Sequence, residues 1–318
     1  MADYKAIKGH NIQTVDGDPS VLQTGDIWYN SSVRKIRGAK IAAGAWASGG
    51  NLNTARTHGG GLGTQTASLL VGGYVAPSAV ENVETYDGSA WTEGSDITTT
   101  RRIYHGGSGT TTAGIVAGGY TSTSVANTET YDGSSWTEVA DLGTARYAGG
   151  CGTQTAALAV SGSPPVDNVE EWNGSSWTEI ADVNTIALRN PAMGTTTAAL
   201  KYAGNPGYIA AAELWNGTSW TEVNDLNTGR VDPGGAGTST LALCYGGQIA
   251  TGVTNVVEEY DGTSWTEVAD LATARQGLGG AGTTTAALGM GGTISPGGHS
   301  NATEEWTKSV AASSFTSS

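Results

Sequence analysis

Six arginines recur along the chain at intervals of 41 to 46 residues, and a ring of them could hold an anionic or sugar ligand. Guanidinium groups suit this role because they form paired hydrogen bonds with carboxylates and phosphates. Asp141, Asp225 and Asp270 each lie five residues before an arginine, so local ion pairs could occupy the same side chains. We favour local pairing, since an acid and a base in one loop satisfy each other, but both interpretations stay open. The six are Arg56, Arg102, Arg146, Arg189, Arg230 and Arg275.

The four histidines are the other side chains that could support metal binding or catalysis. His58 and His105 occupy similar positions in successive repeats and could face a common channel. We interpret them as substitutes for a small residue of an inner strand, because no Cys, Tyr and His cluster with ligand spacing accompanies them. Glu170 and Glu171 are adjacent in a predicted strand and point to opposite faces, so they do not form a two-carboxylate site. We expect no metal, no cofactor and no enzymatic activity.

A tryptophan repeat indicates the elements that position these residues. Six tryptophans follow one another at intervals of 45, 45, 41, 43 and 45 residues: Trp46, Trp91, Trp136, Trp177, Trp220 and Trp265. Five of them lie in nearly identical segments, such as YDGSSWTE at 131–138. An arginine, a Gly-rich stretch, a Gly-Thr turn, an apolar run and usually Gly-Gly follow. A period of about 40–50 residues with several short strands is typical of a propeller blade.

We therefore expect four strands per repeat, called A to D in chain order, and an all-β, six-bladed propeller over residues 41–308. After the last complete repeat the chain supplies strands A, B and C again, but no further Trp repeat follows. The first copy, around Trp46, lacks a strand C before it. We expect the strand around Trp46 to close the last blade beside Trp306, because this removes open sheet edges.

The repeat resembles the kelch repeat, in which an apolar strand and Gly-Gly precede an aromatic residue and then a tryptophan. Residues 69–73 with Tyr86 and Trp91 fit this pattern, as do residues 115–119 with Tyr131 and Trp136. Ser161-Gly162 and Ala203-Gly204 depart from Gly-Gly, and positions 307–308 are Thr-Lys in place of Asp-Gly. The resemblance covers about residues 41–307 and implies a kelch-type β-propeller.

The four-strand order places the A–B and C–D turns on one face and the B–C and D–A loops on the other. The A–B turns are nearly invariant, whereas the B–C loops differ from copy to copy. Variable loops on a repeated scaffold are the usual carriers of binding, although neutral drift of solvated loops would also produce such variation. The candidate binding face therefore combines the six arginines with residues of these loops, namely Tyr74, Tyr120, Tyr208 and His299.

Composition excludes several classes of protein. The chain has 49 Gly among 318 residues, which disfavours a helical fold. Its 29 acids and 15 bases give a charge of −14, which disfavours binding to nucleic acid. No apolar run approaches the roughly 20 residues of a membrane span. Cys151 and Cys244 lie at different places in their repeats, so we expect buried thiols and no disulfide between them.

Residues 1–40 differ from the repeats and carry six bases and four acids, whereas the remaining residues carry nine bases and 25 acids. Residues 25–36 read as a small hairpin, and a lone hairpin is marginally stable. We expect it to dock on the propeller, on copies of the same chain, or on a larger assembly. Its candidate anchor residues are Trp28, Tyr29, Arg34, Lys35 and Arg37. Residues 309–318 are small and polar and are expected to form a flexible tail.

The GDIWYN segment at 25–30 and the repeat sequence at 54–56 resemble those of kelch-like structural proteins of marine bacteriophages. The resemblance implies a non-enzymatic virion protein, made in the host cytoplasm and belonging to the tail or its fibres. Residues 1–40 would bind other virion proteins, and the B–C loops would bind a glycan or protein of the host surface. The alternatives are a capsid decoration protein, a cellular kelch interaction scaffold, and, with less support, a carbohydrate-active enzyme.

Overall fold

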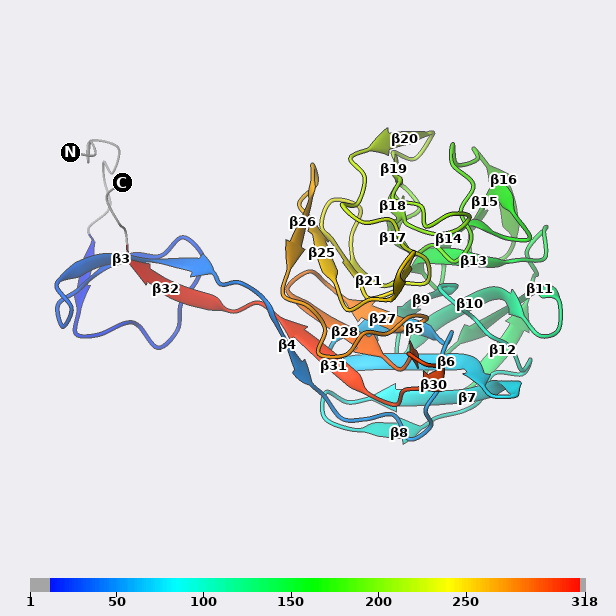
Figure 1. The fold of residues 1–318 in the computed structure, drawn as a ribbon, viewed down its shortest axis with the longest axis horizontal. Helices are drawn as coiled ribbons and strands as arrows, with labels where there is room; N and C mark the ends of the chain where they lie inside the picture. The colour runs from blue at the N-terminus through cyan, green and yellow to red at the C-terminus, as the bar shows by residue number, and fades with distance from the viewer. Residues whose placement is uncertain (1–11, 315–318) are drawn as a thin grey trace. The chain divides into compact units, whose positions relative to one another are not determined.

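The computed structural model describes residues 12–314, and these residues form strands and no helix. None of them could therefore cross a bilayer as a helix. The chain divides into a small unit, built from Met1–Gly44 and Lys308–Ser318, and a large unit, Ala45–Thr307 (Figure 1). The all-β class expected from the sequence is confirmed.

The large unit contains six four-stranded antiparallel sheets, the blades. Blade 1 comprises β5 (Gly60–Thr64), β6 (Ala67–Val75), β7 (Ser78–Tyr86) and β8 (Trp91–Glu93). Blade 2 comprises β9 (Gly107–Thr110), β10 (Ala113–Tyr120), β11 (Ser124–Tyr131) and β12 (Trp136–Val139). Blade 3 comprises β13 (Tyr147–Thr153), β14 (Ala156–Ser163), β15 (Val166–Trp172) and β16 (Trp177–Ile180).

Blade 4 comprises β17 (Ala192–Thr195), β18 (Ala198–Tyr202), β19 (Ala212–Trp215) and β20 (Trp220–Val223). Blade 5 comprises β21 (Gly234–Gly237), β22 (Ala242–Tyr245), β25 (Val257–Tyr260) and β26 (Trp265–Val268), with its B–C loop forming the hairpin β23 (Gln248–Ile249) and β24 (Gly252–Val253). Blade 6 comprises β27 (Gly279–Gly282), β28 (Ala286–Met290), β31 (Thr303–Thr307) and β4 (Ala45–Ser48), with the hairpin β29 (Thr293–Ile294) and β30 (Gly298–His299). Each innermost strand contacts that of the next blade, and β27 contacts β5, so the ring is closed as a six-bladed β-propeller (Figure 1).

The ring closes as the sequence predicted. Strand β4 pairs with β31, Trp46 lies opposite Trp306, and the two ring centroids are 5.5 Å apart. Gln65 of blade 1 secures the junction, because its amide nitrogen donates to the carbonyl of Trp306 at 2.6 Å and to that of Ala287 at 3.1 Å. The two ends of the large unit are thus joined within one sheet, and blade 6 has its full set of strands.

Short polar turns fold the C–D hairpins. In blade 2 a carboxylate oxygen of Asp132 accepts the backbone N–H groups of Ser134 and Ser135, both at 2.8 Å. The hydroxyl group of Ser134 donates to the same oxygen at 2.8 Å, and this bond, together with the two backbone bonds, lowers the pKa of Asp132 to about 2. The turn brings Tyr131 opposite Trp136, with the ring centroids 4.9 Å apart. The recurring segment of each repeat therefore encodes a turn and the aromatic pair that stabilises it.

The Gly-Gly pairs mark a close approach between neighbouring blades. Gly118 has a φ of 67°, and a Cβ there would overlap the carbonyl oxygen of Arg146 in the next blade. Gly119 donates its N–H to that same carbonyl at 3.0 Å, and strand β10 bulges at this point. The second residue of the pair makes the equivalent bond in four other blades, with donors Gly73, Gly204, Gly247 and Gly292 and acceptors Arg101, Arg230, Arg275 and Arg56.

Apolar side chains of adjacent blades fill the space between the sheets. One cluster joins Leu69 and Val71 of blade 1 to Val116 of blade 2, together with the Tyr131–Trp136 pair. Cys151 and Cys244 are buried and unbonded to each other, as expected. Burial raises the pKa of both thiols to about 12, which makes them unreactive core side chains.

The small unit is a four-stranded sheet of order β1 (Gln13–Val15), β2 (Ile27–Asn30), β3 (Lys35–Ile41) and β32 (Val310–Ser314). Strands β2 and β3 form the expected hairpin. The expectation of a flexible tail at 309–318 is wrong for residues 310–314, because β32 pairs with β3 along its length. Its last part, 315–318, lies outside the described residues. The hairpin is thereby extended on both sides, which gives a marginal two-stranded unit the extra strands it needs.

Replacing Gly118 by Ala should destabilise the propeller by more than about 3 kcal/mol, because strain at positive φ adds to a clash with the next blade. Gly207→Ala is the matched control: its φ is 80°, but nothing lies within 4 Å of the added methyl group. The control should lose only about 1–2 kcal/mol. Urea unfolding of both variants measures the difference, and equal losses would contradict the interblade contact.

Candidate functional site

Most of the repeated arginines are buried structural residues and do not form a ring of guanidinium groups open to a ligand. Arg56, Arg146, Arg230 and Arg275 are fully buried, and each forms an ion pair with a glutamate of strand C in its own blade. The partners are Glu84, Glu170, Glu258 and Glu304. The ligand ring predicted as one alternative is therefore wrong for these four positions.

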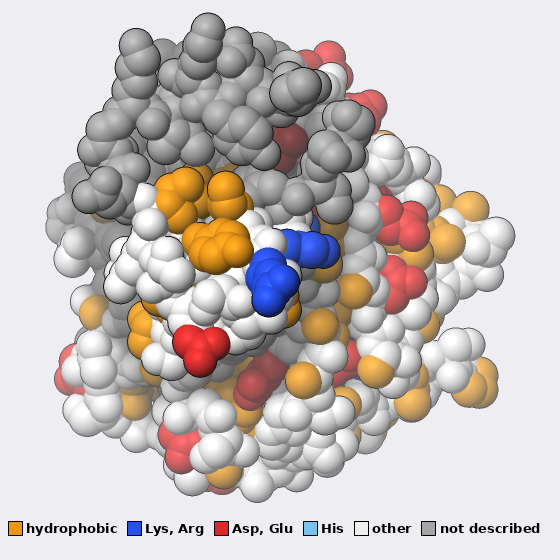
Figure 2. Space-filling view, turned by 90° about the vertical axis from the view of Figure 1, so that its left-hand side faces the viewer, with side chains coloured by type: hydrophobic (Ala, Val, Ile, Leu, Met, Phe, Trp, Pro, Cys, Tyr) orange, Lys and Arg blue, Asp and Glu red, His pale blue; other side chains and the backbone are white. Residues whose placement is uncertain are grey.

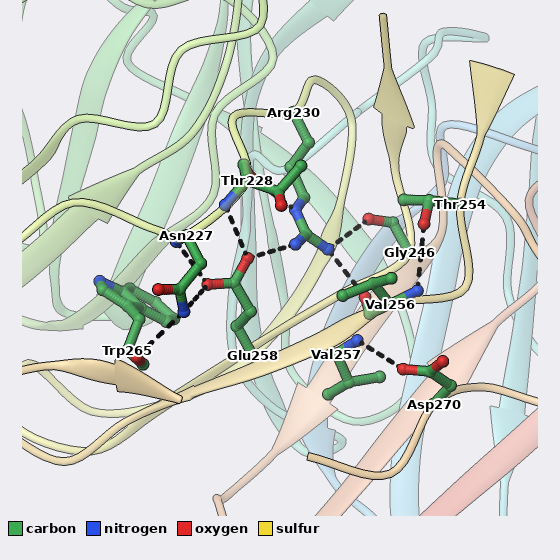
Figure 3. Close-up of polar contacts among 10 residues, drawn as sticks. All are labelled: Asn227, Thr228, Arg230, Gly246, Thr254, Val256, Val257, Glu258, Trp265 and Asp270. Carbon is green, nitrogen blue, oxygen red and sulfur yellow. Dashed lines mark hydrogen bonds and ion pairs between the residues drawn. The ribbon is translucent and has the colours of Figure 1, made fainter. Parts of the chain in front are cut away.

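Figure 3 shows the pair in blade 5. Arg230 bonds to Glu258 and also donates to the backbone carbonyls of Gly246 at 3.2 Å and Val256 at 2.7 Å. Glu258 accepts the backbone N–H of Asn227 at 2.7 Å and that of Thr228 at 3.3 Å. The ion pair thus fastens the D–A loop to strands B and C, and its charges are compensated by several hydrogen bonds, as a buried pair requires.

The aspartates do not pair with the arginines, so that prediction is also wrong. Instead, a carboxylate oxygen of Asp270 accepts the backbone N–H of Val257 at 3.3 Å (Figure 3). Asp141 accepts the N–H of Thr128 in the same way at 3.3 Å. These aspartates attach the D–A loop to strand C, while the longer glutamate side chain reaches the buried cation.

Two of the six positions were assigned out of register. The buried arginine follows the Trp of its repeat by ten residues in five copies, which in blade 2 selects Arg101 and not Arg102. Arg101 is fully buried and bonds to Glu129 at 2.5 Å. In blade 4 the tenth residue is Ala187, and Lys201 from strand B supplies the cation to Glu213 at 2.9 Å. This constant spacing was visible in the sequence and would have identified both exceptions.

Arg102 and Arg189 belong instead to a cluster at the ends of the inner strands away from the A–B turns. Every blade contributes to it, through the starts of strands A and the ends of strands B or their loops. We call it the mouth cluster. Its members are His58, Tyr74, Arg102, Tyr104, Tyr120, Tyr147, Arg189, Asp232 and His299.

Arg102 lies among aromatic rings in this cluster. Its guanidinium carbon is 3.7 Å from the centroid of the Tyr74 ring and 5.5 Å from that of Tyr120, distances typical of cation–π contacts. The Tyr74 ring meets His299 edge-on at 5.5 Å. Tyr120 in turn meets Tyr147 edge-on at 6.1 Å. Three of the predicted face residues, Tyr74, Tyr120 and His299, are therefore brought together around Arg102.

Asp232 occupies the other half of the cluster and is almost fully buried. One carboxylate oxygen accepts from Arg189 at 3.0 Å and lies 3.4 Å from the Nε2 atom of His58. Burial acts to raise the pKa of Asp232, but His58 and Arg189 outweigh it and the pKa is lowered, so this carboxylate is ionised at neutral pH. Tyr104 connects the halves: its ring stacks on Tyr147 at 4.3 Å and lies 4.4 Å from His58.

The backbone around this cluster is unusual. His58, Tyr104, Arg189 and Asp232 all have φ between 53° and 60°, a left-handed conformation that bulky residues rarely adopt. Backbone bonds between blades hold them there: the N–H of His58 donates to Gly277, that of Gly277 to Asp232, and that of Asp232 to Arg189. Strain of this kind concentrates at functional sites.

Several buried polar atoms of the cluster have no hydrogen-bond partner among residues 12–314. They are Nδ1 of His58, Nε of Arg102, Oδ1 of Asp232 and Nδ1 of His299. Buried polar groups are normally satisfied by protein, ordered water or a ligand. The mouth cluster therefore offers both donors and acceptors for a polar molecule.

Tyr208, predicted for the same face, makes no ring contact with the cluster within residues 12–314. It lies in the B–C loop of blade 4, with its carbonyl oxygen packed against Gly229. A cavity of about 140 Å³ is lined by the inner strands, including Gly109, Gly152 and Gly237 at the A–B turns. Its lining also includes Tyr104 of the mouth cluster and His105. His105, which the sequence grouped with His58, thus lines the cavity.

The predicted anchor residues of the small unit separate into two groups. Trp28 is buried and donates to Asp18 at 3.2 Å, and Arg37 pairs with the same aspartate at 2.6 Å, so both stabilise the unit internally. Arg34 and Lys35 are exposed in and after the β2–β3 turn, and Tyr29 is half-buried. Figure 2 shows hydrophobic side chains gathered beside Lys and Arg side chains. Exposed hydrophobic residues of this unit are Val21, Ile27, Val33 and Ile41.

The side chains of the mouth cluster can bind a polar ligand. Asp232 is its single acid, whereas glycoside hydrolysis ordinarily uses two carboxylates. Within residues 12–314, no group of three or more His, Cys, Asp or Glu side chains is arranged to hold a metal ion. The guanidinium groups, phenol rings and imidazoles can instead stack on and hydrogen-bond to a ligand.

Replacing Arg101 by Ala should cost about 3–5 kcal/mol of unfolding free energy, because Glu129 would remain buried without its partner. Arg102→Ala, at the next position, should cost only about 1 kcal/mol, since it removes a stacked side chain without exposing a buried charge. Urea unfolding of the two variants tests the register directly. A larger loss for Arg102→Ala would contradict it.

His105 should make stability fall as the pH is lowered from 6.5 to 4. Burial lowers its pKa from 6.5 to about 4, so in this interval the unfolded chain takes up a proton that the folded protein does not. The loss attributable to His105 should be about 1–3 kcal/mol. His105→Gln should flatten the pH dependence of urea unfolding by that amount, and an unchanged slope would argue against a buried neutral imidazole.

No protein-family model and no curated protein sequence matches this chain.

Proposed function

We propose that this protein is a non-enzymatic virion component, of the tail or tail fibre, whose kelch-type propeller binds the surface of a host cell. The observation that carries the proposal is the difference between the two ends of the propeller. One end carries the variable B–C loops and the mouth cluster, with aromatic and charged side chains from every blade. The other consists of repeated Gly-Thr turns, such as residues 152–156 and 194–198.

The division of the chain supports attachment through the small unit. Both chain ends contribute to that unit, which leaves the large unit as an uninterrupted segment, Ala45–Thr307. Ile27 and Val33 expose 41% and 50% of their surface, and Arg34 and Lys35 are exposed near them in sequence. Exposed apolar residues beside basic ones are suited to a protein interface with an acidic rim. The resemblance of residues 25–30 to phage structural proteins accords with a virion as the partner.

Mass spectrometry of purified particles from the source virus should detect this chain, and its absence would refute the proposal.

The double variant Arg34→Glu, Lys35→Glu should reduce the incorporation of the protein into particles, because it reverses the charge of the exposed turn. Tyr120→Ala should leave incorporation unchanged and weaken adsorption of particles to host cells about 10-fold, since an aromatic side chain of the binding face is lost.

The control for the binding face is Thr112→Ala, which alters an exposed residue of an A–B turn at the opposite end of blade 2. It should change neither incorporation nor adsorption. If adsorption were lost with Thr112→Ala and retained with Tyr120→Ala, the ligand would bind at the end with the A–B turns, which contradicts the proposal.

A further inference from the structure

Arg102 is the single cation of the large unit that has no acidic partner, a statement that covers all of residues 45–307. This segment has eight Lys and Arg residues and 25 acids. Six of the eight are buried in ion pairs with a strand C glutamate, and a seventh, Arg189, holds Asp232. Although the unit has so large an excess of acids, no carboxylate lies within 4.0 Å of Arg102. Its guanidinium group is therefore available to bind a ligand.

We infer that Arg102 binds the anionic group of an acidic sugar at the mouth cluster. This inference rests on the proposed function and names the class of surface ligand. The mouth cluster contains two arginines and one aspartate, so it is locally positive, and surface charges farther than about 8 Å are largely screened at physiological ionic strength. The acidic surface of the propeller therefore does not prevent an anion from reaching Arg102.

The surroundings of Arg102 orient its guanidinium group. The Tyr74 ring covers one side at 3.7 Å, and the centroid of the Tyr120 ring lies 5.5 Å from the guanidinium carbon. Its Nε atom has no partner within residues 12–314. A planar guanidinium held on an aromatic face is preorganised for a bidentate bond to a carboxylate or phosphate.

The remaining side chains favour a sugar over an acidic peptide. Tyr120 and His299 are only partly buried and lie next to the Arg102–Tyr74 pair, where a sugar ring can stack and its hydroxyl groups can bond. Burial, His58 and Arg102 lower the pKa of His299, so a neutral imidazole can both donate and accept. A peptide would gain little from the backbone here, because Arg102 already pairs with Tyr120, and Thr57 with Tyr74.

Calorimetric titration of the full chain with trigalacturonate tests the carboxylate form of the ligand, and glucose 6-phosphate tests the phosphate form. Binding of either one should weaken about 10-fold or more in Arg102→Gln, which removes a charged hydrogen bond. Arg102→Lys should retain part of the affinity, since it keeps the charge and loses the bidentate geometry. The matched control, Lys40→Gln, removes an exposed cation of the small unit and should leave binding unchanged.

The methyl ester of trigalacturonate keeps the sugar rings but replaces the carboxylates by neutral ester groups, and it should bind at least about 10-fold more weakly. Equal binding of acid and ester, unchanged affinity in Arg102→Gln, no binding of either charged sugar, or equally tight binding of hexaglutamate would each overturn the inference. Host-cell adsorption is measured in parallel. Adsorption that Tyr120→Ala weakens, with no binding of acidic sugar, rejects this inference alone, whereas adsorption that Tyr120→Ala leaves unchanged rejects the proposed function.

Discussion

The propeller depends on one residue position that precedes strand A, which holds a cation in five of the six blades. Its side chain holds the strand C glutamate of its own blade, and its carbonyl accepts the Gly N–H of the preceding blade. The same residue thus fastens a loop within one sheet and joins that sheet to its neighbour. Because the pair is buried, removing either partner would leave an uncompensated charge. This structural role explains why an arginine recurs at the same position of successive repeats.

Blade 4 shows how the structure accommodates the loss of that residue. Ala187 replaces the arginine, and Lys201 supplies the charge from strand B. In the preceding blade Ser161 replaces the first Gly of the pair, and its hydroxyl bonds to the backbone of Ala187 in both directions, at 2.7 and 3.1 Å. The two departures from the repeat therefore occur at one interblade junction and compensate for each other. Arg189 lies two residues after Ala187 and pairs with Asp232.

The mouth cluster follows from the same constraint. Residues eleven and twelve after each Trp lie directly beyond the anchored cation, where backbone bonds link one blade to the next. These positions include Arg102, Tyr147, His58, Arg189 and Asp232. Their backbone is held by the ring, so their side chains can differ from blade to blade without altering the fold. A rigid, repeated scaffold thus presents one variable set of side chains.

The sequence by itself determined the six blades, the closing strand and the hairpins, because each depends on local spacing: the Trp repeat, the turn residues, and three strands left over at residues 275–307. It also contained the ten-residue spacing that separates Arg101 from Arg102, although its meaning required the glutamate partners. Only the tertiary structure decided which cation is left unpaired, because pairing joins residues 12 to 43 positions apart in the chain through side-chain reach and burial. It also decided the place of residues 310–314, since a short polar segment becomes a strand only when a distant strand edge such as β3 is available to pair with it.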